Sequence, residues 1–219
     1  MVCYSERFLN ECTWRAGELI AEGVLGRVLH VAIAGPHRLS KEKRPDWFFR
    51  KEQYGGIITD IMSHQFEQFL CFTEETDATI NFARVENFAN PDKPELEDFG
   101  EVSLTGANGA SSYCRADWFT PDGLRTWGDG RVFIVGTKGT MELRKYLDLA
   151  RESSPDKIFL VNGEAELEID CAGKVGFPFF GQFILDCLHR TENAMTQEHA
   201  FKAAELSLRA QQLADEARD

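Results

Sequence analysis

The residues whose types and spacing could do chemistry lie in one short run in the first third of the chain. Two glycines, Gly55 and Gly56, are followed by Asp60 and His64 at the start of a stretch with helical apolar spacing. On a helix, a separation of four residues places two side chains on one face, one turn apart. Imidazole exchanges protons near neutral pH. We therefore predict an acid–base pair in which His64 transfers a proton and Asp60 holds a substrate hydroxyl or orients the ring.

Three alternatives for this run stay open. Asp60 in the first turn of a helix stabilises the helix dipole without any catalytic role, and a helical histidine can be satisfied by backbone or water. With Glu67, the two residues also have the ligand types of a metal site, although zinc would need a further His or Cys nearby. We predict no metal site and assign Glu67 to a supporting or solvated position.

The composition excludes some classes of function. The chain has 219 residues, with 24 Lys and Arg against 36 Asp and Glu, and a formal net charge of -12. Because phosphate backbones and anionic lipids bind basic surfaces, we expect neither nucleic-acid nor membrane partners. No apolar run has the length of a membrane-spanning helix, and the N-terminus lacks the pattern of a secretory signal.

The cysteines indicate a reducing compartment. None belongs to a C-x-x-C pair, which argues against metal knuckles and against a disulfide framework. Free, mostly buried thiols are typical of cytosolic proteins, so we predict a cytoplasmic location. The six cysteines are Cys3, Cys12, Cys71, Cys114, Cys171 and Cys187.

The second half of the chain has the pattern of consecutive hairpins. Asn108-Gly109 and Asn162-Gly163 are strong hairpin turns between apolar or alternating segments. Consecutive hairpins require antiparallel neighbours, since parallel strands need crossover helices. The strands expected here are 76–88, 99–106, 110–119, 131–135, 140–143, 157–161 and 164–169, followed by helices over 179–189 and 196–217.

The first half supplies the remaining elements. Residues 35–54 combine Pro, charge and aromatic residues, a composition typical of a pocket wall. The expected elements are a buried strand over 1–4, a helix from 10 or 13 to 22, a strand over 28–34 and a helix over 59–72. Together these elements predict an α+β fold, with a large, open, mostly antiparallel β-sheet and helices on one face. We expect the open face to form a homo-oligomer.

The run Gly55-Gly56-x-x-x-Asp60-x-x-x-His64-x-x-Glu67 resembles the signature of the Gfo/Idh/MocA oxidoreductases, typified by glucose-fructose oxidoreductase and inositol dehydrogenase. Three further segments, at residues 4–8, 19–28 and 135–141, resemble pieces of the same family in the same order. The resemblance covers almost the whole chain. It departs from the signature where Ile57 replaces a third glycine and Glu67 replaces a final Asp.

The resemblance implies that the substrate and the cofactor are bound by two different domains, and that this sequence lacks the cofactor-binding one. Family members begin with a Rossmann domain that has a glycine-rich turn and an E-K-P segment with a catalytic lysine, and neither motif is present here. Residues 1–9 would be the edge of that nucleotide-binding domain, and residues 10–219 a C-terminal α+β substrate-binding and oligomerisation domain. The cofactor would be NAD or NADP, bound only with the missing domain, so we expect the chain alone to be inactive.

The implied reaction transfers a hydride to or from a sugar, inositol or related polyol. Sugars stack on aromatic rings and accept hydrogen bonds from charged side chains. Ordinary packing is the alternative for the tryptophans, and a surface salt bridge is the alternative for Arg7. The candidate substrate-binding residues are Tyr4, Arg7, His37, Arg38, Trp47, Arg115, Trp118 and Trp127.

Two other functions fit the same residues. The chain could be a non-catalytic sugar-binding or dimerisation module that has lost its cofactor domain. It could also be a metal-dependent lyase or hydrolase that uses Asp60, His64 and Glu67.

Overall fold

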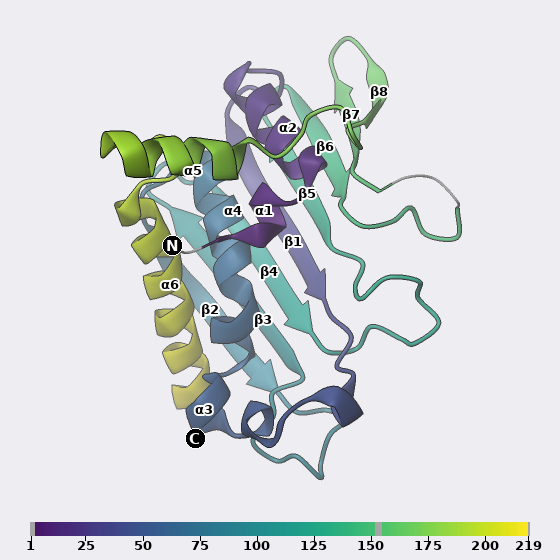
Figure 1. The fold of residues 1–219 in the computed structure, drawn as a ribbon, viewed down its shortest axis with the longest axis vertical. Coiled ribbons are helices and arrows are strands. Elements are labelled where there is room, and N and C mark those ends of the chain that lie inside the picture. Colours follow the sequence, from purple (N-terminus) through teal and green to yellow (C-terminus); the bar gives the residue numbers. More distant parts are fainter. Residues whose placement is uncertain (1–2, 152–154, 219) are drawn as a thin grey trace.

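Strands whose apolar residues alternate with polar ones join one large sheet, as their pattern predicts. The computed structural model describes residues 3–151 and 155–218 and places eight strands in the order β2-β3-β4-β1-β5-β6-β7-β8 (Figure 1). Their bounds are β1 Val28–Pro36, β2 Ala78–Glu86, β3 Phe99–Gly106, β4 Ser111–Asp117, β5 Arg131–Gly136, β6 Gly139–Arg144, β7 Lys157–Asn162 and β8 Glu166–Asp170.

The predicted fold class is confirmed, with one pairing that the hairpin pattern does not contain. β1 runs parallel to β4, with Ile33 opposite Cys114, and antiparallel to β5. The other neighbours pair antiparallel. β1 thus joins the sheet through partners distant in sequence, between two strands that the chain forms much later.

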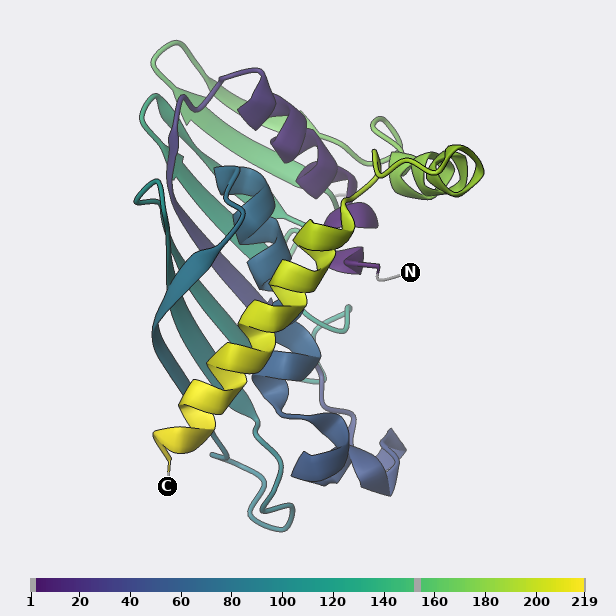
Figure 2. The same cartoon turned by 90° about the vertical axis from the view of Figure 1, so that its left-hand side faces the viewer.

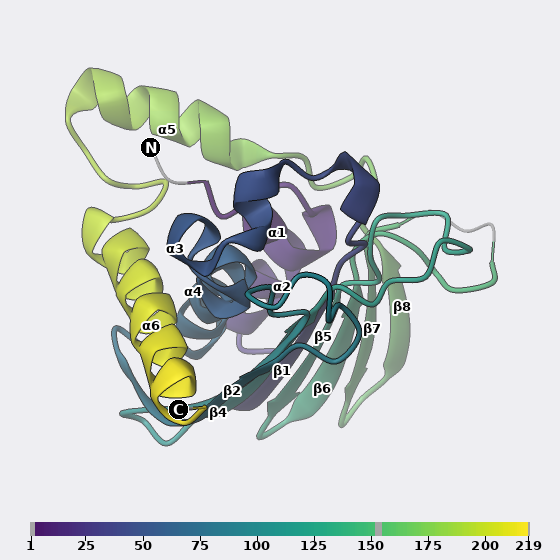
Figure 3. The same cartoon turned by 90° about the horizontal axis from the view of Figure 1, so that it is seen from below.

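The helices lie on one face of the sheet and leave the other uncovered (Figures 2 and 3). Helix α4 follows a π-helical turn, η3, which contains Asp60, and α6 packs beside it. Helix α5 extends away from this layer (Figure 2). The helices are α1 Ser5–Phe8, α2 Glu11–Ala21, η1 Lys41–Lys43, η2 Asp46–Phe49, α3 Lys51–Tyr54, η3 Ile58–Met62, α4 Ser63–Thr73, α5 Pro178–His189 and α6 Gln197–Glu216.

The two faces of the sheet differ as strand alternation requires. Toward the helices, side chains such as Val102, Ile134 and Leu143 are fully buried. On the uncovered face, aromatic and aliphatic side chains are between 38% and 47% exposed: Phe82, Tyr113, Phe133, Val135 and Val161. This face therefore carries an apolar surface that no element of the described chain covers.

The start of the chain differs from the prediction of a strand over residues 1–4. Residues 1 and 2 lie outside the described part, and Cys3 and Tyr4 have no strand conformation. Instead α1 begins at Ser5, and the buried rings of Tyr4 and Phe8 join the core. Within the described residues, no helix combines the length and apolar character needed to cross a membrane.

Candidate functional site

Helix α4, which carries His64, is fixed by a buried ion pair. The guanidinium of Arg7 donates to Glu67 Oε1 from Nε at 2.6 Å and lies 2.5 Å from it through Nη2. His199 of α6 lies 3.1 Å from the same oxygen. The Glu67 side chain is 0% exposed, and its contacts with the Arg7 guanidinium and His199 hold its pKa below its usual range against the effect of burial. Of the two positions predicted for Glu67, supporting or solvated, the structure has the supporting one, since Glu67 is buried and ties α1 and α6 to α4.

The His64 ring lies one turn before Glu67, against the edge of the Tyr4 ring at a centroid distance of 5.8 Å. Its Nδ1 is buried and has no hydrogen-bond partner among the described residues. Burial lowers the pKa of His64, and the ammonium of Lys145 lowers it further, while Glu6 and Glu67 act in the opposite direction. A neutral imidazole at neutral pH can accept a proton, as a general base must.

A polar network reaches this helix from two distant parts of the chain. Gln68 donates to the His64 carbonyl at 3.0 Å and accepts from Lys145 Nζ at 3.0 Å. Lys145 also forms an ion pair with Glu6 at 2.9 Å, and the Tyr146 hydroxyl donates to the same carboxylate. Lys145 lies on the helical face because it continues the alternation of β6 two residues after Leu143.

Aromatic side chains extend from this network along one end of the sheet. The His37 ring, directly after β1, lies 4.4 Å from Trp127 and 5.5 Å from Trp118. Trp127 in turn lies 4.7 Å from Tyr146, and its side chain is 42% exposed. The structure thus brings together three of the predicted substrate-binding residues. Trp118 is buried, whereas the half-exposed ring of Trp127 is suited to stacking on a sugar.

Asp60 is exposed to solvent, and the charged groups that act on it differ from those that act on His64. Desolvation by the surrounding protein raises the pKa of its carboxyl, and Arg44 lowers it. It occupies the π-helical turn before α4, a local geometry frequently found at functional sites. Arg44 is thus the charged group that acts on Asp60, whereas the charges that act on His64 come from α1, α4 and the end of β6.

Some predicted binding residues are engaged elsewhere. Arg115 points to the uncovered face of the sheet, where it pairs with Asp117 at 3.1 Å, because Cys114 and Ala116 on either side point inward. Its guanidinium is thus engaged on the face of the sheet opposite to the helices. Arg38 donates to the Pro121 carbonyl at 3.1 Å and holds the loop 121–124.

The remaining predicted residues have mixed positions. The Tyr4 hydroxyl donates to the Ala200 carbonyl at 2.7 Å, so Tyr4 contributes only its ring beside His64. The guanidinium of Arg7 is used by Glu67, and this pair is buried rather than a surface salt bridge. Trp47 is 50% exposed and lies 6.0 Å from the Phe48 ring.

Sequence reasoning missed Glu6, Gln68, Lys145 and Tyr146. Glu6 and Lys145 are separated by 139 residues, so no local spacing marks them as partners. One signal was available, since a lysine at an inward position directly after an apolar strand must find a buried partner.

The glycine pair before η3 does not form a dinucleotide cradle. A Cβ at Gly56 would lie 2.3 Å from Gln211 Oε1, and the amides of Ile57 and Ile58 bond to the side chains of Glu97 and Gln211. Protein side chains therefore fill the position that a pyrophosphate would need at this helix start. A nicotinamide cofactor does not fit this turn.

The structure also bears on metal binding. In residues 3–151 and 155–218, no three His, Cys, Asp or Glu side chains gather closely enough to hold a metal ion. Glu67 is held by Arg7 and His199 instead, which leaves the metal-dependent alternative without structural support.

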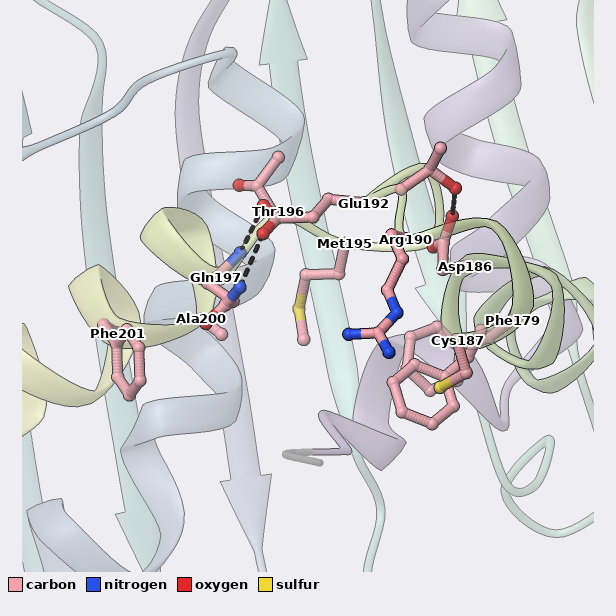
Figure 4. A pocket seen from close by; sticks show the side chains of 12 residues that line it. Phe179, Asp186, Cys187, Arg190, Glu192, Met195, Thr196, Gln197, Ala200 and Phe201 are labelled. Carbon is pink, nitrogen blue, oxygen red and sulfur yellow. Dashed lines mark hydrogen bonds between the residues drawn. The ribbon is translucent and has the colours of Figure 1, made fainter.

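The chain contains a cleft of about 500 Å³ between α5 and α6, which does not include Asp60 or His64. Its lining is mostly apolar, and Arg190 extends into it between Met195 and Phe179 (Figure 4). The cleft is separated from His64 by Tyr4, which bonds to the cleft residue Ala200.

Comparison with known proteins defines the class. Residues 13–142 match the model of the GFO/IDH/MocA C-terminal domain. The chain is 51% identical to a proposed oxidoreductase from Erwinia carotovora atroseptica SCRI1043, with a TM-score of 0.93, over 96% of this chain and 63% of that one. The chain therefore belongs to the Gfo/Idh/MocA family of oxidoreductases.

More distant structures share the fold. An aldose-aldose oxidoreductase from Caulobacter crescentus, complexed with glycerol, is 18% identical with a TM-score of 0.74, over 98% of this chain and 61% of that one. A levoglucosan dehydrogenase, in complex with NADH and levoglucosan, is 16% identical with a TM-score of 0.76, over 100% of this chain and 64% of that one. The chain spans less than two thirds of each of these proteins. Comparison with curated proteins yields no match.

Proposed function

We propose that this chain is the substrate-binding half of an NAD(P)-dependent oxidoreductase that acts on a sugar, inositol or related polyol. The observation that carries the proposal is the half-buried His64 ring, whose pKa is lowered and whose Nδ1 has no partner in the described residues. The rings of His37 and Trp127 at the same end of the sheet support a polyol ligand. Neighbours complexed with NADH, levoglucosan or glycerol support the reaction class.

In this proposal His64 removes the proton of the substrate hydroxyl as the hydride leaves the carbon that bears this hydroxyl. In the reverse direction His64 returns the proton to the oxygen. The exposed Asp60 carboxylate accepts a hydrogen bond from a substrate hydroxyl and so orients the carbon. A nicotinamide held by a nucleotide-binding domain supplies the hydride acceptor. The residues described here supply no dinucleotide cradle at the glycine pair Gly55-Gly56, so the chain alone should not turn over.

The uncovered sheet face supports a second part of the proposal, a homo-oligomer. Phe133 and Tyr113 lie on either side of Ala32 in one row across the strands, and both rings are solvent-exposed. Two such faces would cover each other's apolar surface. We further propose a cytoplasmic location for the assembled protein, which fits its six free cysteines.

The test begins with the genomic frame upstream of Met1. An in-frame unit with a glycine-rich turn and an E-K-P segment gives the extended protein, which is then assayed with NAD and NADP against a panel of sugars and inositols. We expect His64→Asn to lower kcat by about 10²–10⁴-fold, and His189→Asn, an exposed histidine on α5, to leave it unchanged. Full turnover in the His64 variant would exclude the proposed role. A stop codon with its own ribosome-binding site would favour the non-catalytic module.

A further inference from the structure

The buried cation Lys145 is not explained by the proposed chemistry so far. Its side chain is 1% exposed and its Nζ bonds to Glu6 at 2.9 Å and to Gln68 at 3.0 Å. A buried ion pair of this kind adds little net stability compared with an apolar pair of similar volume. Its position therefore calls for a different explanation.

Gln68 links this pair to the base. Its amide donates to the His64 carbonyl at 3.0 Å while its oxygen accepts from Lys145, so Gln68 links the ammonium to the helical turn that carries His64. Glu6 balances that charge from α1 and is itself fixed by the Tyr146 hydroxyl. We propose that the Lys145–Glu6 pair, tied to α4 through Gln68, sets the charge state of His64 and keeps its ring ready to accept a proton.

The groups that face His64 from each neighbouring element are accounted for. Glu6 lies on α1, Lys145 follows β6, Glu67 lies on α4 itself and His37 follows β1. Glu67 is paired with Arg7 and His199. The His37 ring is half-buried and its pKa is lowered by desolvation, so it is uncharged at neutral pH. Lys145 lowers the pKa of His64, whereas Glu6 and, to a smaller extent, Glu67 raise it.

A lone cation would make the ring too weak a base, and a lone carboxylate would keep it protonated. With both present, the ring stays neutral in the resting protein, while Glu6 offsets part of the charge that develops when the ring takes a proton. The protonated ring has two N–H donors, and Nδ1 has no acceptor among the described residues, which also favours the neutral form. Lys145 and Glu6 are therefore positioning residues, since their effect on the substrate acts through His64.

This inference rests on the proposed acid–base role of His64, but its test does not require turnover. The full chain is labelled with ¹³C at the histidine Cε1 position and titrated by NMR between pH 5 and 9, with His64→Asn used to assign the resonance. We expect Lys145→Met to strengthen proton binding by His64 about tenfold, and Glu6→Gln to weaken it about tenfold. Lys145→Arg keeps the charge and should change the constant less than about threefold.

Opposite shifts are the decisive result, because a merely structural role would loosen the site in both variants and move His64 in one direction. Shifts of the same sign, or none, would overturn the inference. If Lys145→Met does not fold, the test rests on Glu6→Gln, which should weaken proton binding by His64, against Lys145→Arg, which should leave it nearly unchanged; no weakening in Glu6→Gln would then overturn the inference. A different outcome would be that the two variants shift proton binding by His64 in opposite directions, while the His64 variant of the extended protein keeps full turnover. That outcome would exclude the proposed function and leave this inference standing.

Discussion

Replacing Arg7 by methionine tests whether the ion pair under α4 is a buried interaction. Surface ion pairs contribute about 0–1 kcal/mol, whereas removal of one partner from a buried pair costs about 3–5 kcal/mol. The Arg7–Glu67 contacts of 2.5 and 2.6 Å, with side chains 13% and 0% exposed, place this pair in the second class. We therefore expect Arg7→Met to lower the free energy of unfolding by about 3–5 kcal/mol at pH 7.

Urea unfolding followed by far-UV circular dichroism measures this loss. The matched control is Arg15→Met, which removes an arginine paired with Glu18 and Glu22 on the exposed face of α2 and should cost less than about 1 kcal/mol. The double variant Arg7→Met/Glu67→Met should be more stable than Arg7→Met alone, because it removes the stranded carboxylate.

The stability loss in Arg7→Met should depend on pH through the charge of Glu67. In the native protein the pKa of Glu67 lies below its ordinary value of 4.5, so this group stabilises the fold above about pH 4.5 and the contribution is lost as the pH falls. In Arg7→Met, burial dominates and raises that pKa, so the penalty should shrink as the pH falls toward 4. A loss below 1 kcal/mol at pH 7, or a penalty that grows on acidification, would refute the reasoning.

Two further substitutions test the uncovered face and the glycine turn. If the uncovered face forms the proposed homo-oligomer, Phe133→Lys should give monomers in light scattering, while Phe88→Lys, exposed outside the sheet, should not; an unchanged mass would refute the interface. Gly56→Ala should lower stability by about 1–3 kcal/mol, because φ is +99° and the new Cβ would contact Gln211, whereas Gly181→Ala meets nothing within 4 Å. Equal melting temperatures for these two variants would contradict the described turn.

The parts of the fold that follow from local pattern could be predicted from the sequence. Alternation located the strands, and Asn108-Gly109 marked a turn between β3 and β4 that the structure contains. The parallel pairing of β1 with β4 could not be predicted, because it depends on which distant strand pairs with each edge of β1. Arg115 was predictable on the uncovered face, since the same alternation that located β4 places it there.

The candidate site divides in the same way. His64 was predicted because its spacing from the glycines is local. His37 was predicted because it lies in an aromatic-rich loop, and Trp127 because it is an aromatic residue near the expected sheet. The charges that act on His64 come from Glu6 and Lys145, which meet only through tertiary structure. Electrostatic control of a site is a long-range property, and single-sequence patterns do not contain it.

The hydrogen bond between the Tyr4 hydroxyl and the Ala200 carbonyl joins residues 196 positions apart. During synthesis on the ribosome, the Tyr4 hydroxyl therefore cannot form this bond until Ala200 has emerged. Contacts of such long separation slow folding, because the intervening chain loses its freedom before the contact forms. The part of the inner apolar face formed by β2 remains open to chaperones and to other nascent chains until α6 emerges to cover it.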